Sequence, residues 1–511
     1  MDGFCAPVDD ILFSLRHVAG AEGVEEWDSD LASDVLGHFG DFAQGVIAPL
    51  NGVGDAKGAR LENGRVRMPP GFAEAYGQLA EAGWQGLSAP EAFGGMEASP
   101  LVAAGVSEIF SGANHAMQMV CNLVPGAIST LIRFGTPEQQ EAWVPRLASG
   151  EVLSTMCLTE AAAGSDLSAI RCKAEREGDG WRITGEKIFI SGGDQDMSAG
   201  ILHLVLARSG AAGIKGLSLF LCPAQAGVQV TRIEEKMGLH ASPTCAMAFE
   251  RAKAELIGEE GAGLAAMFTL MNHARLDVSL QGVAHAARAY AISSEYAKER
   301  VQGRMAEGAP ARLSDHADVR RMLDAQRALA IGARAMCHVA LVELERGAAP
   351  ALGEFLTPLC KVFASEAGIR AADLGIQILG GYGYLEEYGL SQIWRDARIT
   401  AIYEGANGIH ARALATRGLR DGGGSAEFMR LISDLSGGHR VIADHLARWD
   451  QRRQAVADMD DPAAAAHGFM EATAGLYYMA AWARIAMVAE HHADAQELLR
   501  LADIVLDETG A

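Results

Sequence analysis

Residues 180–191 read GWRITGEKIFIS, and this stretch decides the class of the fold. Trp181 and Ile183 alternate with polar residues, and the run is rich in β-branched and aromatic side chains, a pattern typical of a half-buried strand. Similar short runs, bounded by Gly, Asp and Pro, occur nearby: VLSTMCL (152–158), ILHLVLA (201–207), GLSLFLC (216–222) and VQVTRI (228–233). Residues 151–255 are therefore expected to form an antiparallel, all-β module.

The sequence on both sides of this module has a helical period instead. Within residues 28–150, the segment TPEQQEAWVPRLASG (136–150) carries helix boundary signals: an N-cap Thr136, a proline directly after it and a closing glycine. After the module, long amphipathic stretches cover 264–303, 314–347 and 355–380. The triplet GGG (422–424) is the clearest linker signal, and a further helical segment follows it. This order of helical and β parts is not the βαβ alternation of a doubly wound fold.

Composition narrows the possible partners. The chain has 511 residues, of which 49 % are hydrophobic, and 43 Lys and Arg stand against 65 Asp and Glu, for a net charge of −22. Such a charge repels nucleic acid and anionic membrane surfaces, and after residue 420 alone there are 15 acidic and 7 basic residues. No uncharged apolar stretch reaches about 18 residues, so no membrane insertion is expected. The N-terminus lacks the basic region of a signal peptide, and the eight cysteines lack CxxC spacing, which favours reduced thiols and a cytoplasmic location.

The sequence lacks the common metal and nucleotide motifs. It has no zinc spacing, no HExxH, no GxSxG and no GxxxxGK[ST], so no metal is expected. GGYGY (380–384) follows a helical pattern rather than a strand, and is therefore interpreted as a helix end and tight turn, not as a dinucleotide fingerprint. The fifteen histidines are scattered, and structural roles are favoured for them.

Two segments point to chemistry. In TMCLTEAAAGSDLSAI (155–170) an apparent strand ends in a loop of small and polar residues, where the amides and hydroxyls around Thr159, Gly164 and Ser165 can bind an electron-rich ring or a phosphate. In RDARITAIYEGANGIHA (395–411) a single carboxylate, Glu404, lies between an apolar run and a Gly-rich bend. Desolvation there would raise its pKa toward that of a general base, although on its own Glu404 would be interpreted as a solvent-facing residue at a helix start.

The order of several segments indicates a family. Seven segments follow one another in this order: MCLTEAAAGSDL, WRITGEKIFISGG, KMGLHAS, the stretch around NHARLD, ERVQG, QILGGYGY and IYEGANGIH. Because of these segments, the chain resembles the acyl-CoA dehydrogenase family between about residues 30 and 415. Within the family, the chain is most similar to the subgroup that contains 3-methylmercaptopropionyl-CoA dehydrogenase. This similarity rests on APLNGVGD (48–55), HLVLAR (203–208), GLAAMFTLMNHARL (263–276) and the extra C-terminal segment.

The resemblance implies a mainly α fold with a central antiparallel β domain. The implied parts are an N-terminal extension (1–30), a helical N-terminal domain (31–154), a middle β domain (155–256), a C-terminal four-helix bundle (257–420) and an extra helical C-terminal segment (421–511). The family binds FAD and functions as a homodimer or homotetramer, in which FAD reaches a neighbouring subunit.

The resemblance also implies site residues. Those expected at FAD are Met156, Leu158, Thr159, Gly164, Ser165, Phe189, Ser191, Arg300, Gln302, Gln377, Gly380, Gly381, Ala406 and Gly408. Ser165, Arg275, Tyr403 and Gly405 are expected at the acyl-CoA substrate. Glu404 falls on the family's catalytic base, which removes the α proton of the thioester while a hydride leaves the β carbon for flavin N5. An electron-transfer flavoprotein or O₂ would then accept the electrons.

Several positions depart from the family pattern. Ala161–Ala162 replace the usual Pro-Gly and are expected to loosen a turn, Ala406 replaces a Thr, His410 replaces an amide, and His273 and Asp277 flank Arg275 where less polar residues are common. These departures leave open a flavin-dependent oxidase or oxygenase that acts on a CoA thioester. A non-catalytic flavoprotein binding module is a further alternative to the dehydrogenase.

Overall fold

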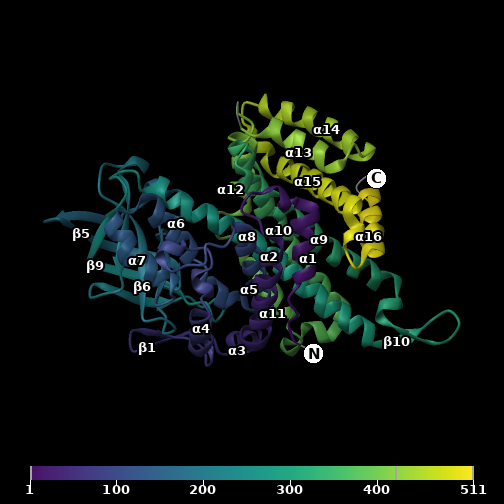
Figure 1. The fold of residues 1–511 in the computed structure, drawn as a ribbon, viewed down its shortest axis with the longest axis horizontal. Coiled ribbons are helices and arrows are strands. Elements are labelled where there is room, and N and C mark those ends of the chain that lie inside the picture. The colour runs from purple at the N-terminus through teal and green to yellow at the C-terminus, as the bar shows by residue number, and fades with distance from the viewer. Residues whose placement is uncertain (1–2, 421–422, 509–511) are drawn as a thin grey trace. The chain divides into compact units, whose positions relative to one another are not determined.

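A computed structural model describes residues 3–420 and 423–508, except the side chains of Leu270, Asn272, His273 and Glu508. The departure noted at His273 therefore lies outside the described residues, as does Gly422 of the glycine triplet. The chain forms two compact units, of which unit 1 comprises Met1–Gln44, Pro100–Gly112 and Arg275–Ala511, and unit 2 comprises Gly45–Ser99 and Ala113–Ala274. Helices make up 62 % of the structure (Figure 1), which confirms the predicted mainly α fold with a central sheet.

Unit 2 is built around one seven-stranded sheet. Its strands are β3 (Val152–Cys157), β4 (Lys173–Glu177), β5 (Gly180–Ser191), β6 (Gly200–Arg208), β7 (Leu217–Pro223), β8 (Val228–Ile233) and β9 (Thr244–Ile257). Pairings run from β6 through β4, β5, β9 and β7 back to β6, so the sheet closes on itself, while β3 pairs with β6 and β8 pairs with β9. The closure removes most of the exposed edges that an open sheet would present.

The five predicted strands agree with β3, β5, β6, β7 and β8 to within a residue or two, whereas β4 and β9 were not predicted. The prediction of an antiparallel module was wrong for part of the sheet. β3 pairs with β6 in parallel, with Val152 opposite Gly200 and Cys157 opposite Val205. A parallel pair requires a long crossover connection, and here β4 and β5 provide it. Period-two patterning reports which face of a strand is buried and carries no information on the direction of its neighbour.

Short helices and a hairpin complete unit 2. They are α3 (Asn51–Lys57), α4 (Phe72–Glu81), α6 (Val124–Phe134), α7 (Pro137–Ala148) and the hairpin of β1 (Arg60–Glu62) and β2 (Arg65–Arg67). At the start of α7, Thr136 is the N-cap and Pro137 occupies the first helical position, as the sequence predicted. Thr136 also forms a reciprocal capping box with Gln139. His240 contacts Asp55 and the carbonyl of Lys236, which is a structural role.

Unit 1 is helical. It contains α1 (Val8–Phe13), α2 (Ser29–Phe42), α9 (Ala317–Arg346), α10 (Pro350–Leu379), α11 (Leu390–Ala397) and α12 (Asn407–Thr416), with the hairpin of β10 (Val301–Arg304) and β11 (Pro310–Arg312). Two long helices, α5 (Pro100–Cys121) and α8 (Gly263–Glu299), have residues in both units. GGYGY begins directly after α10 as a single 3-10 turn with Gly380 at φ 61°, in agreement with its interpretation as a helix end.

Within unit 1, α8 and α10 approach each other at a pair of glycines. A Cβ added to Gly282 would lie 2.2 Å from the carbonyl oxygen of Ala364, and one added to Gly368 would lie 2.7 Å from the carbonyl oxygen of Gly282. Only residues without a side chain allow two backbones to come so close. This crossing fixes the relative position of the side chains that leave α8 and α10 on either side of it.

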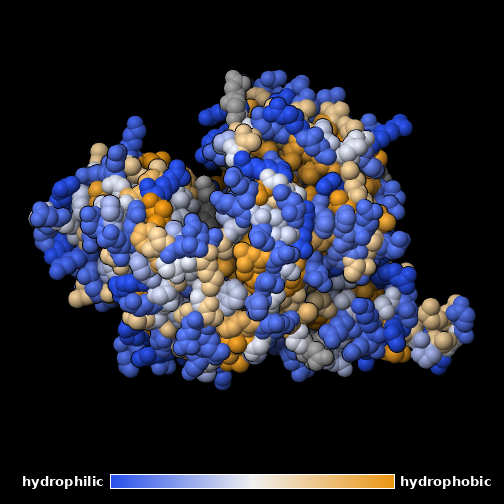
Figure 2. All heavy atoms as spheres, viewed as in Figure 1, coloured by the Kyte–Doolittle hydropathy of each residue, from blue (hydrophilic) through white to orange (hydrophobic). Residues whose placement is uncertain are grey.

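The helices after the glycine triplet pack directly on unit 1. These are α13 (Ser425–Ser436), α14 (Arg440–Ala457), α15 (Ala466–Val488) and α16 (Ala495–Glu508), and α15 contacts both α9 and α12. Phe428 of α13 lies 5.1 Å by ring centroid from both Phe355 of α10 and Trp449 of α14, and the Tyr477 hydroxyl donates to the carbonyl of Met336 at 2.8 Å. On the face shown in Figure 2, hydrophilic residues cover much of the surface of these helices. The segment is thus held by an aromatic core, not only by its linker.

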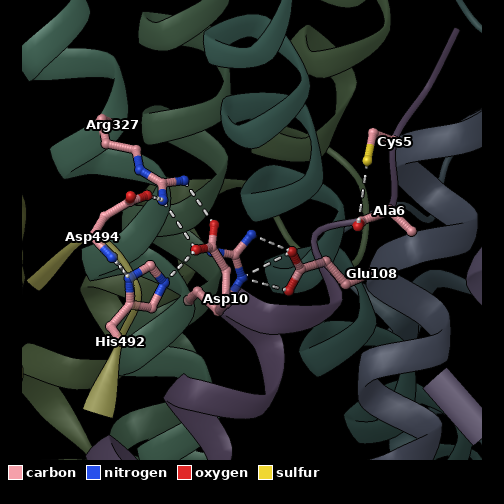
Figure 3. Close-up of polar contacts among 8 residues, drawn as sticks. Cys5, Ala6, Asp10, Glu108, Arg327, His492 and Asp494 are labelled. Atoms are coloured by element: carbon pink, nitrogen blue, oxygen red, sulfur yellow. Dashed lines mark hydrogen bonds and ion pairs between the residues drawn. The ribbon is translucent and has the colours of Figure 1, made fainter. Parts of the chain in front are cut away.

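A buried ionic cluster ties the N-terminal helix to the rest of unit 1 (Figure 3). Arg334 of α9 and Glu108 of α5 have fully buried side chains and form a bidentate pair with bonds of 2.6 and 3.0 Å. Asp10 of α1 accepts bonds from Arg327 at 2.7 Å and from His492 at 3.0 Å. Because an unpaired buried charge is costly, this cluster strongly favours one docking of α1, α5, α9 and the C-terminal segment.

Candidate active site

Glu404 lies in a strained turn between a 3-10 turn, Arg398–Ala401, and helix α12. Its φ is 53°, and that of Gly405 is 99°, so two successive residues have positive φ. A side chain is rarely found at such an angle, and a Cβ added to Gly405 would lie 2.8 Å from His410 Nε2, so glycine is required there. Backbone strain of this kind is often found at functional sites.

Partial burial raises the pKa of the Glu404 carboxyl to about 7, and the positive charges of Arg275 and Lys361 oppose that rise while Asp277 adds to it. In the described part of the chain, the carboxylate receives no hydrogen bond and forms no direct ion pair. A carboxylate with this pKa and without a fixed partner can take up a proton near neutral pH, which is what a general base requires.

Three side chains hold the backbone of this turn. Lys361 Nζ donates to the carbonyl of Gly405 at 2.8 Å, and Arg275 Nε donates to the carbonyl of Glu404 at 3.4 Å. His410 Nε2 also lies 3.1 Å from the Glu404 carbonyl. Since a carbonyl only accepts, this nitrogen carries the proton. Burial lowers the pKa of His410 to about 4, so the ring is neutral at physiological pH.

Tyr403 is held by a second chain of hydrogen bonds. Its hydroxyl donates to Gln281 Oε1, and Gln281 Nε2 donates to Asp277 at 2.8 Å. The Ser107 hydroxyl donates to the other oxygen of Asp277. The departure at Asp277 is thereby explained, because a carboxylate at this position accepts from both neighbours and fixes the tyrosine next to Glu404.

The candidate FAD residues of unit 2 gather where β3 and β5 end. The carbonyl of Thr159 accepts a hydrogen bond of 2.9 Å from the amide of Ile188, and the carbonyl of Leu158 accepts one of 3.0 Å from Lys187 Nζ. Lys187 is fully buried and also pairs with Glu160 at 2.8 Å. The structure therefore brings Met156, Leu158 and Thr159 next to Phe189 and Ser191, and Gly164 and Ser165 lie exposed in the loop that follows β3.

Phe189 has two unusual features. Its φ is 58°, one of six positive values among the described residues other than glycine, and its aromatic side chain is 60 % exposed. The backbone is strained at this position, and the aromatic ring is accessible at the surface.

A third set of candidate residues lies elsewhere on unit 1. The Arg300 guanidinium lies 5.7 Å from the centre of the Tyr382 ring, next to Gly380 and Gly381, and Gln302 lies on β10. Gln377 is near the end of α10, 16 residues after Lys361, which corresponds to about 24 Å along the helix. Within one chain, these residues are therefore not brought together with Glu404. All five are exposed.

The remaining departures have simple structural consequences. The expected loosening at Ala161–Ala162 is not seen, because the amides and carbonyls of Glu160 and Ala163 bond reciprocally at 3.0 and 3.1 Å. Neither alanine has a positive φ, so the turn does not need glycine. Ala406 precedes α12 as its N-cap and provides no side-chain cap, and Gly408 lies exposed in the first turn of that helix.

Sequence reasoning missed Lys361 and Asn407. Lys361 is fully buried in α10, and Nζ donates to Asn407 Oδ1 at 2.9 Å. A signal was present, since one lysine inside the apolar run LTPLCKVFA (356–364) is unusual in a helix and is buried only when it has a partner.

The described residues contain no cluster of three or more His, Cys, Asp or Glu that could hold a metal ion. Across that same part of the chain, no helix has the length and apolar character needed to cross a membrane. All eight cysteines are free thiols, of which only Cys5 is exposed.

Three family models match in order: the acyl-CoA dehydrogenase N-terminal domain over residues 37–151, the middle domain over 155–252 and the C-terminal domain over 261–419. A 3-methylmercaptopropionyl-CoA dehydrogenase from Ruegeria pomeroyi is 42 % identical over 84 % of this chain and 79 % of its own length. The chain belongs to the acyl-CoA dehydrogenase family.

Solved structures of this family agree with the fold. Butyryl-CoA dehydrogenase from Megasphaera elsdenii superposes with a TM-score of 0.67 at 27 % identity, covering 75 % of this chain and 96 % of that one. ACDH-11 from Caenorhabditis elegans, at 19 % identity, shares the fold over 99 % of this chain and 91 % of its own, with a TM-score of 0.83. The family and the oxidoreductase class predicted from the motifs are confirmed, and the oxidase, oxygenase and non-catalytic alternatives are not favoured.

Proposed function

We propose that this chain catalyses the FAD-dependent α,β-dehydrogenation of an acyl-CoA thioester with Glu404 as the base. The family assignment supports acyl-CoA dehydrogenation with FAD as the cofactor. One observation supports the role of Glu404: its carboxyl group has a pKa of about 7 and lies in a strained turn. The carbonyls of that turn accept hydrogen bonds from Arg275 and Lys361.

The residues around Glu404 fit this role. The carboxylate removes the α proton of the thioester, and the fixed Glu404–Gly405 turn limits where the carboxylate can reach. The Tyr403 hydroxyl donates to Gln281, and this bond holds the tyrosine ring in place next to the base. Arg275 is proposed to contact the CoA portion of the substrate, together with Ser165 and Gly405. Arginine stays protonated in proteins, so the Arg275 guanidinium carries a positive charge and suits an anionic ligand.

The residues proposed for FAD also fit that group. In unit 2 they are Met156, Leu158, Thr159, Gly164, Ser165, Phe189 and Ser191, and the exposed ring of Phe189 suits the face of a flavin. In unit 1 they are Arg300, Gln302, Gln377, Gly380, Gly381, Ala406 and Gly408. Bound FAD would supply the acceptor for the hydride that leaves the β carbon.

We also propose an oligomeric state, an electron acceptor and a cellular location for this protein. Since Arg300 and Gln377 lie far from Glu404 in one chain, we propose that they bind FAD of a neighbouring copy, in a homodimer or homotetramer. An electron-transfer flavoprotein rather than O₂ is the proposed acceptor, and the cytoplasm is the proposed location. A steady rate of O₂ uptake with acyl-CoA in air, without an added acceptor, would contradict this choice of acceptor.

The test of the base is Glu404→Gln. The variant is expected to retain FAD and bind acyl-CoA, while the rate at which the substrate bleaches the flavin falls by about 10²–10⁴-fold, the usual contribution of a general base. The substrate panel begins with 3-methylmercaptopropionyl-CoA, because a 42 % identical relative bears that name, and continues with straight, branched and aromatic acyl-CoAs.

Glu354→Gln is the matched control, since it makes the same change on the exposed side of α10 and is expected to bleach at the wild-type rate. Bleaching by Glu404→Gln at a rate near that of Glu354→Gln would remove Glu404 from the role of base.

A further inference from the structure

Lys361 is a buried cation whose contacts all lie at the turn that carries Glu404. It projects from the middle of α10, its side chain has no exposed surface, and Nζ donates to the Gly405 carbonyl at 2.8 Å and to Asn407 Oδ1 at 2.9 Å. A buried ammonium is costly unless it is paired or well hydrogen-bonded. Here both acceptors are neutral, so no carboxylate pair accounts for its presence.

Asn407 extends the contact along α10. It is the first residue of α12, and its Nδ2 donates to Ser365 at 3.1 Å and to Glu366 at 2.8 Å, both on α10. Lys361 and Asn407 therefore join α10 to the two ends of one short segment, Gly405 and the start of α12. That segment begins directly after Glu404, whose own φ is positive.

Charged and titratable groups face Glu404 from each helix around it. Arg275 and Asp277 come from α8, Lys361 from α10 and the neutral His410 from α12. Arg275 is only partly buried and holds the turn by a bond of 3.4 Å, whereas Lys361 is fully buried and its bond is shorter.

We propose that Lys361 is a positioning residue for the base: it anchors the Glu404–Gly405 turn to α10 and places a fixed positive charge near the Glu404 carboxylate. This inference rests on the proposed function of Glu404. Removal of the ammonium would free the Gly405 carbonyl and allow the turn, with its two positive φ angles, to relax. It would also remove a charge that favours the ionised form of the base.

The test compares Lys361→Met with Lys361→Arg and with Thr357→Val. Lys361→Met removes charge and donors, Lys361→Arg keeps both, and Thr357→Val removes one side-chain hydrogen bond of α10 outside this contact. For Lys361→Met we expect kcat to fall by about 10²-fold with a smaller change in KM, as for a misplaced catalytic group. The rising limb of its kcat/KM profile should move to higher pH, and Lys361→Arg should restore that limb at least in part.

Hydrogen–deuterium exchange provides a readout that does not depend on turnover. Peptides covering residues 403–410 should exchange faster in Lys361→Met than in wild type or Thr357→Val, while exchange elsewhere in α10 stays the same. If Lys361→Met does not fold, the neutral Lys361→Gln replaces it under the same criteria. A wild-type pH profile together with wild-type exchange would overturn the proposal. Full activity of Glu404→Gln would instead overturn the proposed function. The exchange measurement would then still show whether Lys361 anchors the Glu404–Gly405 turn to α10.

Discussion

The closest helix approach near the candidate site makes Gly282→Ala an informative perturbation. The new methyl group would lie 2.2 Å from the Ala364 carbonyl oxygen and 2.4 Å from its carbon, both of them backbone atoms. Restoring ordinary contact would move α8 and α10 apart by about 1 Å, and such overpacking costs about 1–3 kcal/mol. The gain in helix propensity from Gly to Ala, about 1 kcal/mol, offsets only part of this cost.

The displacement would also reach the site. Gln281, next to Gly282, holds Tyr403, and Lys361, one turn before Ala364, holds the turn of Glu404. A shift of about 1 Å in catalytic groups can lower kcat by about 10²-fold. We therefore expect Gly282→Ala to unfold at lower urea concentration and to bleach its flavin more slowly with acyl-CoA.

Gly353→Ala is the matched control for this experiment. Its methyl group would also lie 2.2 Å from another atom, but that atom is Leu344 Cδ2, the end of a flexible side chain that can rotate away. The control is expected to be as stable as wild type or slightly more so, with normal bleaching. Equal stability and activity of the two alanine variants would refute the view that the backbone crossing of α8 and α10 fixes the site.

Two further predictions follow from charges in unit 1. Because the pKa of Glu404 is about 7, kcat/KM should rise with pH and level off above about pH 7. Asp277→Asn removes a negative charge that raises the pKa of Glu404, so kcat/KM of this variant should rise at lower pH than that of wild type. An unchanged pH profile would contradict the assigned effect of Asp277 on Glu404. Glu108→Gln removes the bidentate carboxylate partner of the buried Arg334 and leaves it only the 3.4 Å contact to Asp10, so it should lower the free energy of unfolding by about 3 kcal/mol in urea titrations. Glu108→Leu combined with Arg334→Met should cost less, and the reverse order would contradict the reasoning.

The sequence alone supported much of the fold. Periodicity located five strands of the sheet and the three long helices α8, α9 and α10, because side-chain burial imposes a period on each element whatever its neighbours are. The helix start at Thr136 was predictable for the same reason, since capping depends on residues within one turn. The direction of β3 beside β6 was not, because pairing joins residues about 48 positions apart.

The candidate base illustrates the same division. Glu404 could be selected from its own surroundings, an apolar run followed by a glycine bend, and from a family resemblance that local motifs carry. Its pKa and its anchoring required the fold, since Arg275, Lys361 and Asp277 are 129, 43 and 127 residues away in the sequence, and come close only when α8 and α10 cross at Gly282. Local patterns thus determined which elements form and which residue is the candidate base. The charges around that residue were decided by tertiary packing, because electrostatic and hydrogen-bond energies depend on distance in space and not on distance along the chain.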